Sequence, residues 1–234
     1  MLSNSFKWKH YEGEIILLNV RWYLKYPLSY RNLKEIMAER GVKVDHTTIM
    51  RWVHQYSPEI EKKIRRHLRP TNDSWRVDET YIKVKGKWIY FYRAVDSNGD
   101  TIDFMLSSKR NRTAAKRFLK KALSSNRNQI LILITVDKNP AYPSAIDKLK
   151  NDKILPKNIG IRQIKYLNNI LEQDHRSIKR IFNPMLGFQS FRSANKTLKG
   201  IEAMNMIKKR QVNDLSYSVL NEIKYINQLF GILL

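Results

Sequence analysis

Apolar residues recur every three to four positions through the N-terminal quarter of the chain, which is the spacing of amphipathic helices. The pattern predicts helices over residues 12–26, 30–40 and 46–56. Ser29 and Asp45 precede the second and third helices as N-caps, because their side chains can accept hydrogen bonds from first-turn amides. Pro27 and Pro58 stop the first and third helices, and Gly41 ends the second.

The period changes after residues 58–74, whose polar, basic and proline-containing sequence predicts a linker between domains. Three runs rich in β-branched and aromatic residues follow, with turn residues between them at 85–87 and 97–100, and they predict three consecutive antiparallel strands. The remaining pattern predicts a helix over 112–125, a strand over 129–136 buried on both faces, a helix within 142–152, a strand over 159–164, and helices from about Leu167 and over 193–210. This order indicates a mixed α/β fold class with a single core.

The helix, glycine-containing turn and second helix over residues 29–56 form the signature of a helix-turn-helix. In a DNA-binding module of this kind, the early residues of the second helix face the major groove. Those residues are His46, Thr47, Thr48 and Arg51. The residues expected to pack inward are Ile49, Trp52 and Val53. A plain helical hairpin without DNA contacts is the alternative.

The formal net charge of +23 is spread along the whole chain. Basic and acidic residues number 14 and 7 in residues 1–70, 23 and 11 in residues 71–186, and 7 and 3 in residues 187–234. This distribution favours a polyanionic partner contacted along the length of the chain. Nucleic acid is the first candidate, and a membrane surface is a weaker one because no strongly basic amphipathic helix stands apart.

The absence of cysteine from the sequence excludes disulfides and thiolate chemistry. The first residues lack the apolar stretch of a signal peptide. The longest apolar run, residues 130–136, is far short of the ~20 residues that span a bilayer. We therefore expect a soluble, cytoplasmic protein with no membrane partner.

Acidic residues are few, so their positions are informative. Asp78 lies inside the first predicted strand between apolar neighbours, and Asp137 directly follows the apolar run at 130–136. The C-terminal end of a buried strand is the usual place for a ligand site in an α/β sheet. Taken singly, each acid is also compatible with capping a strand end or a loop.

The helix predicted from about Leu167 divides its charged residues by face. At about 100° per residue, one apolar stripe comprises Leu167, Ile170, Leu171, Ile178 and Ile181. A different face carries Glu172, His175, Arg176 and Lys179. Asp174 projects near the middle of the apolar stripe, so we expect it to pair with the sheet or with an arginine such as Arg162. Of the two acids, Glu172 is the one placed for chemistry, with the three cations beside it for DNA phosphates.

Three carboxylates that converge in one site repel one another unless a cation lies between them, and Mg²⁺ prefers oxygen ligands. Two such ions about 3.5–4 Å apart can activate an attacking oxygen and stabilise the leaving oxygen of a phosphodiester. The sequence contains no His and Cys cluster for zinc, no G-x-x-x-x-G-K-[ST] phosphate loop and no G-x-S-x-G elbow. Asp78, Asp137 and Glu172 are therefore the candidate catalytic and metal-binding acids.

The candidate acids are separated by 58 and then 34 residues. Around them stand WRVDETYIKVKGKWIYFYRAVD, TVDKNPAY and KYLNNILEQDHRSIKR, and elsewhere LSYRNLKEIMAERGVKVDHTTIMRWV, GFQSFRSANKTLKGIEAMNMI and IKYINQLFGI. Together these segments resemble the DDE transposases of short bacterial insertion sequences, in particular the cointegrate-forming group of about this length. The resemblance covers nearly the whole chain.

The resemblance implies a ribonuclease-H-like catalytic domain over residues 70–212, a helix-turn-helix DNA-binding domain over 1–69 and a helical tail over 213–234. It implies that the three acids hold two Mg²⁺ ions, for which Mn²⁺ is expected to substitute. The implied reaction is hydrolysis at the 3′ ends of the element, followed by attack of the freed 3′-OH on target DNA. Lys179, seven residues after Glu172, matches the family's cation that contacts the terminal DNA, and Arg176 lies beside it.

Enzymes of this kind join two DNA ends, so the resemblance also implies a homo-oligomer that works at the bacterial nucleoid. The apolar residues of the tail are expected either to form an oligomer contact or to pack on their own domain. Two other function classes stay open: a helix-turn-helix regulator with a sensory α/β domain, and an integrase or nuclease of the same fold. Short inverted repeats flanking the gene would distinguish a transposase from a free-standing regulator.

Overall fold

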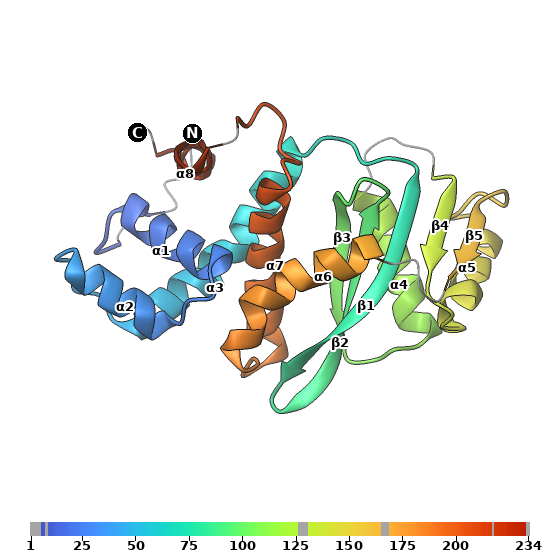
Figure 1. The fold of residues 1–234 in the computed structure, drawn as a ribbon, viewed down its shortest axis with the longest axis horizontal. Helices are drawn as coiled ribbons and strands as arrows, with labels where there is room; N and C mark the ends of the chain where they lie inside the picture. Colours follow the sequence, from blue (N-terminus) through green and yellow to red (C-terminus); the bar gives the residue numbers. More distant parts are fainter. Residues whose placement is uncertain (1–5, 8, 126–130, 165–168, 217, 233–234) are drawn as a thin grey trace. The chain divides into compact units, whose positions relative to one another are not determined.

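The structure is a computed structural model that describes residues 6–7, 9–125, 131–164, 169–216 and 218–232. The helices are α1 (Gly13–Lys25), α2 (Tyr30–Glu39), α3 (His46–Ile64), α4 (Arg112–Ser125), α5 (Ala141–Asn151), α6 (Asn169–Phe182), α7 (Phe191–Lys208) and α8 (Val219–Leu229), with 3₁₀ turns η1 (Arg65–His67) and η2 (Asn183–Met185). The strands are β1 (Ser74–Val84), β2 (Lys87–Asp96), β3 (Thr101–Ser107), β4 (Leu133–Val136) and β5 (Gly160–Gln163). Figure 1 shows these elements.

The contacts group the chain into two compact units. Pro70–Ser177 form one, which we call the sheet unit. Met1–Arg69 and Ile178–Leu234 together form the other, which we call the helical unit. The division after Arg69 coincides with the first predicted domain boundary, whereas α7 groups with the N-terminal helices. A grouping of contacts does not define independently folding domains, so the ranges 1–69, 70–212 and 213–234 stay predictions.

The sheet unit contains a five-stranded mixed sheet in the order β3-β2-β1-β4-β5. β1, β2 and β3 are antiparallel neighbours, as predicted, while β4 is parallel to β1 and β5 is parallel to β4. The turn between β1 and β2 consists of Lys85 and Gly86, whose φ angles are 49° and 75°. Two residues with positive φ form the tight turn that suits the twist of a β-hairpin.

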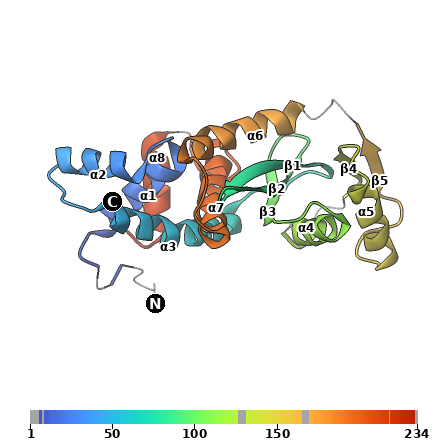
Figure 2. The ribbon, with the colours of Figure 1, turned by 90° about the horizontal axis from the view of Figure 1, so that it is seen from below.

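Helices cover both faces of this sheet, and Figure 2 shows α4 on one side and α6 on the other. The α4 face holds the main core, which includes Trp75 and Val77 of β1, Phe118 of α4, and Tyr142 and Ile146 of α5. Three antiparallel strands followed by two parallel strands, with helices on both faces, form the predicted ribonuclease-H-like fold.

β4 is shorter and less buried than the apolar run predicted. The prediction of a strand over 129–136 buried on both faces is wrong for Ile132, which is 58% exposed and precedes the first β4 residue. Ile132 still bonds both neighbouring segments, through its N–H to the Asp73 carbonyl at 2.9 Å and its carbonyl to the Gly160 N–H at 2.9 Å. Residues 129 and 130 lie outside the described part of the chain. The apolar run therefore predicted the strand, but it did not predict that Ile132, directly before the strand, is exposed.

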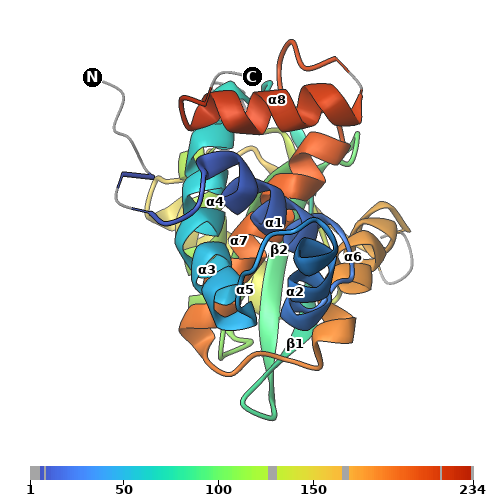
Figure 3. The same ribbon diagram turned by 90° about the vertical axis from the view of Figure 1, so that its left-hand side faces the viewer.

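The helical unit is built from α1, α2, α3, α7 and α8, with α3 packed along α7 (Figure 3). Close approach of α7 to its neighbours depends on Gly200, because a Cβ there would lie 2.5 Å from Leu24 Cδ1 and 2.7 Å from Ser57 Cβ. In α8, Glu222 accepts from Arg21 at 2.9 Å and from Lys25 at 2.5 Å, both in α1. The tail therefore packs on its own unit.

The predicted N-caps of α2 and α3 are confirmed. The Ser29 hydroxyl accepts a hydrogen bond from the Asn32 amide at 3.0 Å, and Asp45 Oδ1 accepts from the Thr47 amide at 2.9 Å. Hydrogen bonds from Thr47, first through its hydroxyl, lower the pKa of Asp45 to about 2. Each cap satisfies one of the amides that a helix leaves free in its first turn.

The prediction that the third helix ends before Pro58 is wrong, because α3 continues through Pro58 to Ile64. Residues 58–64 are therefore helix rather than linker. Pro58 removes one intrahelical hydrogen bond. The turns beyond it bury Ile60 and Ile64, each 0% exposed, and this packing stabilises the helix where local preference opposes it. Among the residues that the structure describes, no helix has both the length and the apolar character needed to cross a membrane.

Candidate active site

Two of the three predicted acids lie side by side in the sheet. Val77 of β1 pairs with Val136 of β4 in parallel register, so Asp78 and Asp137 follow at the same level of adjacent strands. Asp78 is half-buried, and its pKa is raised to about 7, first by burial and then by the negative charges of Glu79 and Asp137. Burial and the two neighbouring acids thus favour the protonated form of Asp78.

Consecutive residues of a strand point to opposite faces of the sheet, so the side chains of Asp78 and Glu79 lie in different surroundings. Asp78 pairs in register with Arg93, which bonds Asp174 of α6 on one face of the sheet. Glu79 pairs with Tyr92 on the other face, which is the face of the main core. β1 therefore presents one acid toward α6 and buries the next.

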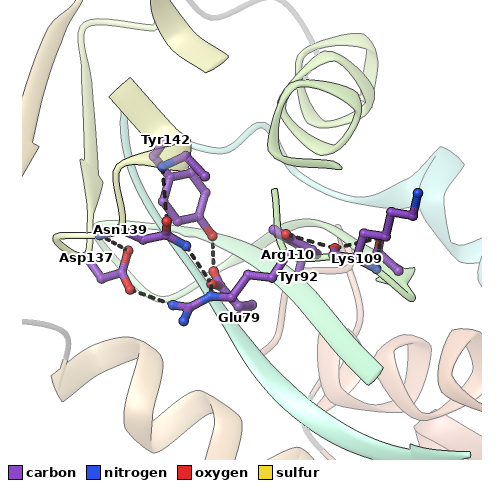
Figure 4. A network of polar contacts seen from close by, with 9 residues as sticks. Glu79, Tyr92, Lys109, Arg110, Asp137, Asn139 and Tyr142 are labelled. Atoms are coloured by element: carbon purple, nitrogen blue, oxygen red, sulfur yellow. Dashed lines mark hydrogen bonds and ion pairs between the residues drawn. The ribbon is translucent and has the colours of Figure 1, made fainter. Parts of the chain in front are cut away.

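The Glu79 side chain is only 1% exposed, and its carboxylate accepts hydrogen bonds from three side chains. It accepts from the Tyr142 hydroxyl, from Arg110 Nε and from Asn139 Nδ2, the last at 3.3 Å (Figure 4). A buried carboxylate is stable only when hydrogen bonds and charge replace water, and this one has both. Glu79 thus ties β1 to the start of α5 and to the segment before α4.

The Asp137 carboxylate is also held on both oxygens. Its Oδ1 accepts from the Asn139 amide at 3.0 Å, and its Oδ2 accepts from Arg110 Nη2 at 3.0 Å (Figure 4). Burial alone would lower the pKa of Arg110, but the hydrogen bond and charge of Glu79 and the charge of Asp137 raise it above the ordinary value. One guanidinium therefore bridges a buried acid and a candidate metal ligand.

Glu172 lies in the first turn of α6 and is exposed, as the helical pattern predicted. Within the described ranges, no group of three or more His, Cys, Asp or Glu side chains is close enough to hold a metal ion. The structure thus brings Asp78 and Asp137 together and leaves Glu172 apart from them.

The opposite placement of Asp174 is confirmed, because Asp174 is 7% exposed and pairs with Arg93, which is fully buried. Its partner is thus in the sheet, and Arg162 is exposed. The placement of His175 with the exposed cations is wrong, since His175 is only 5% exposed. The buried stripe of α6 includes positions 171, 174, 175 and 178, so it is wider than the apolar residues alone indicate. The predicted stripe positions Leu167 and Ile170 fall where no side chain is described.

The predicted DNA-contacting residues are accessible to different degrees. His46, Thr47 and Thr48 are half-buried at the start of α3, and Arg51 is exposed. The Thr47 hydroxyl donates to Asp45 at 2.7 Å, so Thr47 takes part in the helix cap. On α6, Arg176 is exposed and Lys179 is half-buried. The inward residues of α3 are confirmed as buried: Ile49, Trp52 and Val53.

Sequence reasoning missed the polar network behind the acids. Its members are Glu79, Arg110, Asn139 and Tyr142. One signal was available: in the run WRVDETYIK, strand alternation places Glu79 on the face opposite Asp78. A carboxylate on the core face of a strand needs partners, which could have prompted a search for them.

The residues at this point fit a hard divalent cation. Asp78 and Asp137 offer carboxylate oxygens, the ligands that Mg²⁺ prefers. Burial first, and then the charges of Glu79 and Asp137, raise the pKa of Asp78, and a bound cation would oppose that shift. Two oxygen-bearing side chains on adjacent strands, in a strongly basic chain, suit chemistry on a polyanion such as DNA.

Comparison with known proteins identifies the family. Residues 72–211 match a family described as a DDE domain. The transposase for insertion sequence-like element IS431mec of Staphylococcus aureus is 38% identical over 213 residues, which cover 91% of this chain and 92% of that protein. The transposase for insertion sequence element IS257 in transposon Tn4003, also of Staphylococcus aureus, matches with the same identity and coverage.

A solved structure, the HTLV-2 integrase catalytic core domain in complex with magnesium (dimeric form), has a TM-score of 0.45 and 16% sequence identity, covering 62% of this chain and 98% of that chain. The family assignment rests on the two sequence matches and the DDE domain, and it excludes the alternative of a free-standing regulator. This chain belongs to the DDE transposases of bacterial insertion sequences.

Proposed function

We propose that this transposase binds the terminal inverted repeats of its element, cleaves DNA at their 3′ ends and joins those ends to a target. The observation that carries the proposal is the pair Asp78 and Asp137, which lie at the same level of adjacent strands in a DDE domain. The net charge of +23 supports DNA as the substrate.

In this proposal Asp78, Asp137 and Glu172 hold two Mg²⁺ ions, with Mn²⁺ able to substitute. The ions supply Lewis-acid stabilisation of the attacking and leaving oxygens. Asp137 is the best fixed of the three acids, because the Asn139 amide and Arg110 orient its two oxygens. Glu172, exposed at the start of α6, completes the set when DNA and metal are present.

The proposed reaction has two displacements at phosphorus. A water oxygen first attacks the phosphodiester at the 3′ end of the element, the P–O3′ bond breaks, and the 3′ oxygen leaves as a hydroxyl. That 3′ oxygen then attacks a target phosphodiester, and the target 3′ oxygen leaves. Arg176 and Lys179 are proposed to bind phosphates of the terminal DNA, which positions the strand without reading its sequence. Joining two ends makes a homo-oligomer part of the proposal.

A strand-transfer assay tests this function. Full-length protein is incubated with a labelled double-stranded inverted-repeat end, a target plasmid and Mg²⁺. We expect joined product from the inverted-repeat end, little product from a scrambled end of the same length, and none after chelation of the metal. Joining that proceeds equally with both ends, or without divalent metal, would contradict the proposed function.

Recognition of the inverted repeat is proposed to come from the start of α3, where Arg51 is exposed beside His46, Thr47 and Thr48. We expect Arg51→Ala to weaken binding to the inverted repeat by about tenfold, because a single side-chain contact to a base is worth ~1–3 kcal/mol. The measurement is an equilibrium titration of labelled repeat DNA at fixed salt. Discrimination between repeat and scrambled DNA should fall in parallel.

A matched control is Lys224→Ala, which removes one exposed positive charge from α8. It should change affinity for both DNAs by less than about twofold, since it removes only a general electrostatic contribution. If Arg51→Ala weakens repeat and scrambled DNA equally, Arg51 contacts only phosphates and the recognition proposal is wrong.

A further inference from the structure

Arg110 bonds both a buried acid and a candidate metal ligand. Its Nε donates to Glu79 and its Nη2 donates to Asp137 Oδ2 at 3.0 Å (Figure 4). Arg110 comes from the segment between β3 and α4, far in sequence from both acids. One side chain thus offsets charge on a buried acid and on a candidate catalytic acid together.

The Glu79 end of this bridge is fixed. The Glu79 side chain is 1% exposed and also accepts from the Tyr142 hydroxyl and Asn139 Nδ2. Tyr142 is itself fully buried in the core. Because Glu79 is held from three directions, it keeps the planar guanidinium of Arg110 directed toward Asp137.

The contact between Arg110 and Asp137 is accessible to a competing ligand. Its side chain is 31% exposed and that of Arg110 is 34% exposed, so this contact is far less buried than the contact with Glu79. Asp137 Oδ1 already accepts from the Asn139 amide, which closes a local turn and need not change when a ligand binds. Asp137 Oδ2, by contrast, accepts from Arg110, a charged side chain that lies 27 residues away in the sequence.

We infer that Arg110 is the resident counter-ion of Asp137 and competes with a divalent cation for its carboxylate. The inference rests on the proposed function, in which Asp137 is a metal ligand. A cation that reaches Oδ2 meets a guanidinium already bonded there, and the two positive charges repel one another. Arg110 thus acts through Asp137 and lowers the metal affinity of the enzyme without DNA.

The test is the affinity of DNA-free, full-length protein for Mn²⁺, measured by isothermal titration calorimetry. Arg110→Gln removes the charge but keeps a polar side chain near Glu79. We expect Arg110→Gln to bind Mn²⁺ more tightly than the wild type by about two- to fivefold, the size expected from loss of one partly exposed ion pair. A residue with only a structural role would give the opposite sign, because its loss would disorder Asp137.

The matched control is Arg112→Gln, which removes an exposed positive charge in the first turn of α4. It should change Mn²⁺ affinity by less than about twofold. Unchanged or weaker binding by Arg110→Gln would overturn the inference, as would an equal gain in Arg112→Gln. Thermal unfolding of each variant confirms that the folded protein is compared.

Asp137→Asn separates failure of the inference from failure of the proposed function. If the wild type binds Mn²⁺ and Asp137→Asn does not, Asp137 is a metal ligand and the Arg110 result is decisive. If Asp137→Asn binds as tightly as the wild type, or the wild type binds none, the metal site itself is wrong and the inference falls with it.

Discussion

Replacing Glu172 with Gln is expected to lower strand transfer by about a thousandfold or more while leaving the folded state as stable as the wild type. Metal assistance to phosphodiester displacement contributes several kcal/mol, and each ~1.4 kcal/mol is a tenfold change in rate. Glutamine keeps the size of the side chain and removes the charge that holds a cation. Glu172 is exposed, so its replacement removes no core packing.

The measurement is the initial rate of strand transfer with a labelled inverted-repeat end in Mg²⁺, together with a thermal unfolding curve. Gln173→Ala is the matched control, because Gln173 is the next residue of α6 and is also exposed. Its strand-transfer rate should stay within about twofold of the wild type. Wild-type activity in Glu172→Gln would show that Glu172 is not the third acid.

Replacing Asp174 with Ala is expected to destabilise the protein by about 3–5 kcal/mol, the usual consequence of removing one partner from a buried ion pair. Asp174 is 7% exposed and its partner Arg93 is 0% exposed. Without this carboxylate, the Arg93 guanidinium keeps its charge in a buried position and loses the ion pair with Asp174. The free energy of unfolding from urea denaturation measures the effect.

Glu172→Ala is the control for this second experiment, since it also truncates an α6 acid but should change stability by less than about 0.5 kcal/mol. Asp174→Asn, which keeps the shape of the side chain, should also destabilise, because a neutral amide cannot pair with the buried guanidinium. A stable Asp174 variant that fails to bind metal would reverse the roles assigned to the two acids of α6.

The local pattern of the sequence predicted most of the elements because their apolar faces are regular. Runs of β-branched and aromatic residues between turn residues identified β1 and β2, and helical spacing identified α1, α2 and α4. The same reasoning failed at Pro58, where tertiary packing of Ile60 and Ile64 continues a helix that local preference would end. It also failed at His175, because a buried stripe can include a polar residue.

The site was predictable only as far as single side chains could be placed on strands and helix faces. The helical pattern separates Glu172 from Asp174. The position of Asp78 beside Asp137 depends on the pairing of β1 with β4, which the sequence analysis did not predict. The contacts of Glu79 were not predictable in this way, since Arg110 and Tyr142 lie 31 and 63 residues away in sequence. Nothing in local spacing shows which distant side chains meet.

The helical unit is assembled from both ends of the chain, and this constrains how the protein can fold during synthesis. α3 is covered by α7, and residues 68 and 69 bond to 212 and 211. The ribosome therefore synthesises α3 long before α7, which starts at Phe191. All five strands described in the sheet unit are complete by Gln163. Chains terminated by a frameshift or a nonsense codon soon after Gln163 would keep the sheet sequence but lack α7. The face of α3 that packs on α7 would then be exposed, which makes such chains targets for aggregation or proteolysis.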